Sequence, residues 1–153
     1  MNKLSNTVKF NPFTEKNYLC LDIDGTNIGE LVDKHIGKEQ YYDLVPTFLD
    51  WLTDTDSINL VWERAFPENG ESFNAPILMC SEDIDLWCDL IIAKVKFENN
   101  CYIWEDIGIE DGASPELEDL GSEVIWLNIG PFVFSKDNYT SVLNEYRVNK
   151  NYL

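Results

Sequence analysis

Carboxylates, cysteines and a single histidine are the residues of this chain whose types and spacing suit metal binding or catalysis. Asp22 and Asp24 have the first spacing of an EF-hand calcium loop, and Gly25 follows them. Such a loop needs its glycine at position six and a bidentate glutamate at position twelve, whereas Gly25 comes two positions early and Asp33 stands last. The spacing therefore predicts no calcium site. The required glycine is also missing from a second acidic group, Asp83, Asp85 and Asp89.

The cysteines and the histidine form no recognisable catalytic or zinc motif. The four cysteines fall mostly on apolar segments, which predicts free thiols in the core: Cys20, Cys80, Cys88 and Cys101. Only Cys80 and Cys88 are close together, and a zinc site would still need two more ligands. His35 stands in a polar run without a second His or a neighbouring Cys, so we expect it to be exposed. From these side chains we predict no metal, no cofactor and no catalytic residue.

Negative charge is the strongest signal, and it is concentrated in one part of the chain. The 153 residues include 28 Asp and Glu against 11 Lys and Arg, a formal charge of −17. Residues 65–135 hold 15 acids and two lysines, and no base lies between Lys96 and Lys136. This field disfavours DNA, RNA and anionic lipid, which are polyanions, and favours a basic partner. A solvated acidic surface that only keeps the protein soluble is the alternative interpretation.

Two acidic segments within this region are candidate docking surfaces for a basic protein. The first, 82–89, surrounds Trp87 with carboxylates, the composition of an interface anchor with an acidic rim. The second, 105–123, packs eight acids into nineteen residues. Clustered like charge steers encounters with an oppositely charged surface and raises the association rate. The residues that we expect to bind the partner are Glu82, Asp83, Asp85, Trp87, Glu110, Asp111, Glu116, Glu118 and Asp119.

Apolar periodicity predicts the elements that must position these residues. Helices are expected over 41–52 and from Ser135, the latter with an apolar face of Tyr139, Val142, Leu143 and Tyr146. Residues 66–75 are expected to be loop. Asn99 and Asn100 suit a two-residue hairpin, in which Val95 faces Trp104. Strands are expected at 7–10, 18–23, 57–64, 76–80, 90–97, 124–127 and 132–134.

These elements predict an α+β fold: a single domain spanning 1–153, mostly antiparallel β-sheet with two or three helices packed on it. The strands follow one another without the long helical crossovers that parallel pairs require. The length and the 44% hydrophobic content suffice for one real core. Residues 1–9 lack the apolar stretch of a signal peptide, and no window approaches eighteen apolar residues, so we expect a cytoplasmic protein.

The string Leu19-Cys20-Leu21-Asp22-Ile23-Asp24-Gly25-Thr26 resembles the first motif of the haloacid dehalogenase-like phosphatases. The resemblance implies that Asp22 is a nucleophile and that Asp24 is an acid/base beside Mg²⁺. The later acidic pair of that family and its alternating β/α units are missing here. A Mg²⁺-dependent phosphohydrolase is the alternative function, and Asp24-Gly25 equally suits a turn between two strands.

Four short strings follow one another along residues 18–146: Ile23-Asp24-Gly25, then 76–80 with the acidic run 82–85 and Cys88, then 103–108, and finally 132–139. Their order resembles small bacterial immunity proteins of contact-dependent growth inhibition and related polymorphic toxin systems. The resemblance implies a non-catalytic protein that binds and blocks the toxic C-terminal domain of a partner, often a nuclease. A nuclease presents a basic cleft to its polyanionic substrate, and an acidic protein can occupy that cleft. A DNA mimic that inhibits a host nucleic-acid-binding protein would use the same charge.

Overall fold

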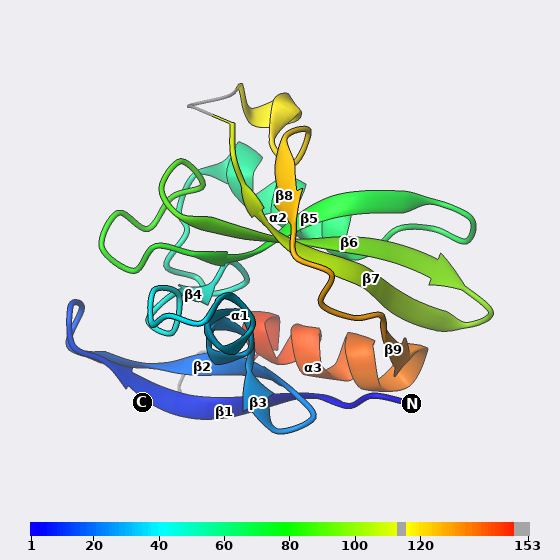
Figure 1. Ribbon diagram of the computed structural model, residues 1–153, viewed down its shortest axis with the longest axis horizontal. Coiled ribbons are helices and arrows are strands. Elements are labelled where there is room, and N and C mark those ends of the chain that lie inside the picture. Colours follow the sequence, from blue (N-terminus) through cyan, green and yellow to red (C-terminus); the bar gives the residue numbers. More distant parts are fainter. Residues whose placement is uncertain (113–115, 149–153) are drawn as a thin grey trace.

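Two antiparallel sheets and three α-helices make up residues 1–112 and 116–148, the part of the chain described by a computed structural model (Figure 1). The smaller sheet has the strand order β1-β2-β3; the larger has the order β4-β5-β6-β7-β8, with β9 paired to β7. The strands are β1 Leu4–Asn11, β2 Lys16–Ile23, β3 Thr26–Asn27, β4 Val45–Pro46, β5 Ser72–Met79, β6 Leu90–Glu98, β7 Cys101–Glu110, β8 Val124–Trp126 and β9 Phe132–Ser135. The helices are α1 Ile28–Ile36, α2 Thr55–Ala65, the short 3₁₀ helix η1 Leu117–Asp119 and α3 Lys136–Val148. The predicted α+β class is confirmed.

Left-handed residues form the tight turns of both sheets. Asp24 and Gly25 have φ angles of 51° and 83° and link β2 to β3, where Ile23 pairs with Thr26. Asn99 and Asn100 have φ angles of 53° and 61° and link β6 to β7. Aspartate, asparagine and glycine tolerate this backbone geometry better than other residues, and it matches the twist of a two-residue hairpin. The predicted hairpin is confirmed, with Val95 opposite Trp104 and Phe97 opposite Tyr102.

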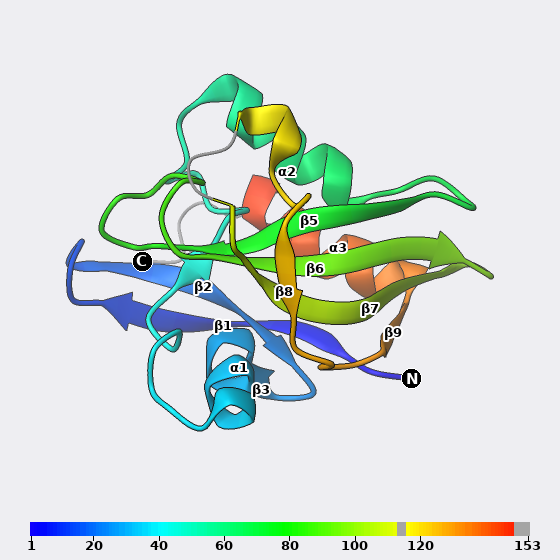
Figure 2. The same ribbon diagram turned by 45° about the horizontal axis from the view of Figure 1, so that its top comes forward.

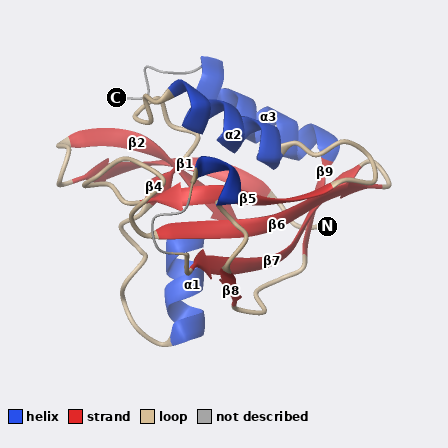
Figure 3. Ribbon diagram, turned by 90° about the horizontal axis from the view of Figure 1, so that it is seen from above, coloured by secondary structure: helices blue, strands red, loops and turns tan. Residues whose placement is uncertain are grey.

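Helix α3 joins the two sheets into one core. The Asn138 side chain exchanges two hydrogen bonds with the backbone of Leu4 on β1, at 2.9 and 3.0 Å. The Tyr139 hydroxyl, fully buried, donates to the carbonyl of Ala65 at 2.7 Å and accepts from Trp104 Nε1 at 3.3 Å. Ser135 caps the helix by accepting from the backbone of Asn138, as predicted. Figure 3 shows α2 and α3 on one side of the strands and α1 on the other. The predicted apolar face of α3 is buried throughout: Tyr139, Val142, Leu143 and Tyr146.

The predicted helix over 41–52 is wrong. The segment is a series of turns around the two-residue strand β4, which pairs with the end of β5. Thr47 extends this contact, because its amide donates to Ile77 O at 3.0 Å and its hydroxyl donates to Pro76 O at 2.8 Å. All residues from Leu44 to Leu49 are buried. A segment buried at consecutive positions contains a helical spacing by coincidence, which is why the periodicity misled.

The predicted strand over 57–64 is also wrong, because these residues belong to α2. Ser57, Val61 and Ala65, four residues apart, form its buried face. Asp54 caps the helix by accepting from the amide and the hydroxyl of Ser57, at 3.0 and 2.7 Å. The expected loop over 66–75 is too long, because β5 begins at Ser72.

Helix α1 has no counterpart in the sequence prediction. It is nine residues long, and Asn27 caps its start while Gly37, with φ of 77°, ends it.

In the described part of the chain no helix has the length and apolar character needed to span a membrane.

Candidate functional site

Both acidic segments leave the larger sheet at the same end. Strand β5 ends at Met79, which pairs with Leu90 at the start of β6. Strand β7 ends at Glu110, which pairs with Val124 at the start of β8, and Ile109 lies opposite Ile91. The connections 80–89 and 111–123 therefore both start from one end of the sheet, opposite the Asn99-Asn100 hairpin. In Figure 1 the first lies at the left, and η1 of the second lies at the top. We call this part of the molecule the acidic end.

The connection 80–89 is held by buried residues and presents charged and aromatic side chains. Ser81 and Leu86 are buried. Glu82 and Asp83 are exposed, and Trp87 is 43% exposed. Asp85 is half-buried, and its carboxylate accepts from the Trp87 amide at 2.9 Å, so this carboxylate shapes the loop.

In the second connection, four predicted docking residues are exposed and one is engaged internally. The exposed residues are Asp111, Glu116, Glu118 and Asp119. Glu110 is half-buried, and its two carboxylate oxygens accept from the amides of Gly112 at 3.1 Å and Gly121 at 2.6 Å. Glu110 thus closes the base of the connection. Its charge still lies close enough to Arg64 to act on the pKa of that residue.

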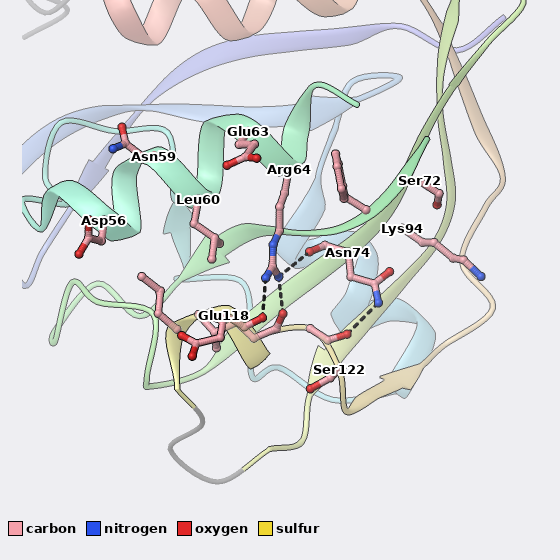
Figure 4. A pocket seen from close by; sticks show the side chains of 14 residues that line it. Asp56, Asn59, Leu60, Glu63, Arg64, Ser72, Asn74, Lys94, Glu118 and Ser122 are labelled. Carbon is pink, nitrogen blue, oxygen red and sulfur yellow. Dashed lines mark hydrogen bonds between the residues drawn. The ribbon is translucent and has the colours of Figure 1, made fainter. Parts of the chain in front are cut away.

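Arg64 anchors this connection, a role that sequence reasoning missed. Its guanidinium donates to the carbonyls of Asn74 at 3.2 Å and Glu118 at 3.1 Å, and also to that of Leu120 (Figure 4). The Asn74 amide adds a bond to Gly121 O at 2.7 Å. Burial lowers the pKa of Arg64, while Glu110 and Glu63 oppose this shift. These bonds place η1 against α2 and β5, as Figure 2 also shows.

An open pocket of about 900 Å³ lies between α2 and the anchored connection (Figure 4). Its lining includes the carboxylates of Asp56, Glu63 and Glu118, with Lys94 at one side. The lining contains no thiol and no histidine, so it offers neither a cysteine nucleophile nor an imidazole base. Arg64 and Lys94 offset two of these three carboxylates, so the lining is of mixed charge with a small negative excess.

The two aspartates of the phosphatase-like motif are bound within the smaller sheet. The buried Asp22 carboxylate accepts from the Thr7 hydroxyl at 2.9 Å and from the Cys20 thiol at 3.6 Å. The exposed Asp24 carboxylate accepts from Asn2 Nδ2 at 2.7 Å and from the amide of Lys3 at 2.8 Å, and these two bonds lower its pKa. The strands around both residues are antiparallel, unlike the parallel strands of an alternating β/α fold.

The structure adds a third residue to the cysteine pair noted in the sequence. Ligand atoms of Cys80, Asp83 and Cys88 all lie within 4.8 Å of one another. All four cysteines are free, and Cys20 is buried whereas the other three are half-buried. His35 is exposed, as predicted. The spacing of two cysteines gave no sign of Asp83, since its proximity depends on the turn between them.

Compared with protein-family models, with curated proteins and with solved structures, the chain matches none. The resemblance to immunity proteins therefore stays a prediction, and function must be argued from the acidic end itself.

Proposed function

We propose that this chain is an immunity protein that binds and neutralises a basic toxin domain, a nuclease, through its acidic end and without catalysis. In this proposal the toxin is the C-terminal domain of a contact-dependent growth inhibition protein or a related toxin, and the encounter takes place in the cytoplasm. The chain itself binds no nucleic acid and no membrane.

The observation that carries the proposal is the convergence of the two acidic segments at one end of the larger sheet. Charges from two separate parts of the sequence are then carried by connections that leave the same end of the sheet, and their fields add in attracting a basic surface. Seven of the nine predicted docking residues are exposed there: Glu82, Asp83, Trp87, Asp111, Glu116, Glu118 and Asp119. Trp87 supplies apolar contact area among these charges, as interface anchors do.

The test measures binding to the toxin domain encoded by the adjacent gene. We expect a stable complex whose association slows as salt rises, because screening weakens electrostatic steering. Reversing Glu116, Glu118 and Asp119 together to lysine should slow association at least about tenfold at low salt. A complex that is indifferent to this triple reversal would overturn the assignment of the acidic end.

A matched control reverses three exposed acids at the opposite, hairpin end of the molecule. Glu98 is the last residue of β6, directly before the hairpin. Glu68 lies near it, because the neighbouring Asn69 pairs with Phe97. Asp137 lies at the same end, two residues after Ser135, which pairs with Cys101. Reversing Glu68, Glu98 and Asp137 changes the net charge equally and should slow association much less. A phosphatase assay tests the alternative function: Mg²⁺-dependent activity that disappears in Asp22→Asn would overturn the non-catalytic proposal.

A further inference from the structure

We propose that Cys80, Asp83 and Cys88 form a zinc site at the base of the connection 80–89. The Sγ atoms and a carboxylate oxygen of these residues lie within 4.8 Å of one another. A zinc site with an open position needs three protein ligands around one point. The two cysteines alone do not meet this requirement, whereas the two cysteines together with Asp83 do.

The distances suit tetrahedral zinc after a small movement of side chains. With zinc–sulfur bonds of about 2.3 Å, two thiolates in tetrahedral geometry lie about 3.8 Å apart. The two Sγ atoms therefore need to approach each other by at most about 1 Å, and rotation of a cysteine side chain moves its Sγ atom by this much. Asp83 is exposed and can turn its carboxylate toward the metal.

The backbone holds the two thiols in place from both sides. Cys80 directly follows β5, and Cys88 precedes β6 by two residues, so the paired strands fix both ends of the connection. The Ile84 amide donates to Cys80 O at 3.0 Å, and this turn brings Asp83 back over the first cysteine. Leu86 is 1% exposed, and its packing in the core fixes the chain between Asp83 and Cys88.

The ligand chemistry selects the class of metal. Two thiolates favour zinc and other thiophilic ions over Mg²⁺ and Ca²⁺, which prefer oxygen. Three protein ligands leave the fourth position to water or to a group from a binding partner. A bound ion would tie the connection that carries Glu82, Asp85 and Trp87 into one conformation, while Asp83 would serve the metal instead of a docking partner.

The test titrates the reduced full-length chain with Co²⁺ and then displaces it with Zn²⁺. We expect one equivalent of Co²⁺ to give thiolate charge-transfer absorption, which Zn²⁺ abolishes. Cys80→Ser and Cys88→Ser should each weaken binding at least about tenfold, and Asp83→Asn should weaken it without removing the thiolate absorption. Cys101→Ser, at another half-buried cysteine, is the matched control and should leave binding unchanged.

Two results would overturn the site. One is the absence of thiolate absorption in protein whose four thiols are shown by mass spectrometry to be reduced. The other is equal Co²⁺ affinity in the wild type and in Asp83→Asn, an exposed substitution that leaves the core intact. Circular dichroism of each cysteine variant separates lost ligands from lost folding.

Discussion

The Arg64→Met variant tests whether one guanidinium holds the second acidic connection in place. Methionine retains most of the aliphatic stem but cannot donate to the carbonyls of Asn74, Glu118 and Leu120. A hydrogen bond from a charged donor contributes about 1.5–3 kcal/mol. Water replaces the donor at the exposed Glu118, whereas Leu120 is 2% exposed and Asn74 is half-buried. We therefore expect the free energy of unfolding to fall by about 2–4 kcal/mol, less than three such bonds combined.

Urea denaturation measures this loss, and amide hydrogen exchange shows where it acts. The Gly121 amide donates to the Glu110 carboxylate at 2.6 Å, so its exchange should accelerate when the connection detaches from α2. Lys94→Met is the matched control, because it removes the same charge from an exposed side chain that lines the same pocket. The control should change stability by no more than about 0.5 kcal/mol. Unaltered stability and unaltered Gly121 exchange in Arg64→Met would refute the anchoring role.

Two further substitutions test the core and a helix cap. Tyr139→Phe leaves Ala65 O and Trp104 Nε1 without their buried partner, so unfolding in urea should occur at lower concentration, with a loss of about 1–3 kcal/mol; equal midpoints would contradict this. Asp54→Ala removes the cap of α2. Bonds from Ser57 lower the pKa of Asp54 in the folded state. The stabilisation that the Asp54 carboxylate gives is therefore present above the unfolded pKa of about 3.9 and is lost as pH falls through the folded pKa. Urea curves of the wild type and Asp54→Ala should therefore differ at about pH 7, and the difference should shrink as pH falls through the folded pKa of Asp54, whereas a gap independent of pH would show that the carboxylate does not act through its charge.

The parts of the fold that depend on local chemistry could be predicted from the sequence. The Asn99-Asn100 hairpin follows from two residues that tolerate left-handed backbone, and the register follows from the apolar residues beside them. Helix α3 follows from its Ser135 cap and its apolar spacing. Each of these signals lies within a dozen residues, so no distant contact was needed to interpret it.

The errors lie where distant contacts decide the structure. Residues 41–52 have a helical spacing, yet pairing of β4 with β5 and the bonds of Thr47 to Pro76 and Ile77 hold them in turns. In α2, the alternation of Ile58, Leu60 and Trp62 concealed the buried face at every fourth residue. Tertiary packing overrides such short patterns.

For the candidate site too, local features could be predicted and distant contacts could not. Counting charges located both acidic segments, because composition is a property of the sequence alone. Their meeting at one end of the sheet depends on the register of four strands. The anchor between Arg64 and Leu120 spans 56 residues, and no local pattern signals it.

The bonds between Leu4 and Asn138 span 134 residues and so determine when α3 can cover the smaller sheet during synthesis. At about 5–20 residues per second, a ribosome needs roughly 7–27 seconds to travel from one residue to the other. Strands β1 and β2 can pair early, but the surface that α3 covers waits for nearly the whole chain. The emerging protein therefore carries an uncovered apolar face for most of its translation, and its final helix closes the fold.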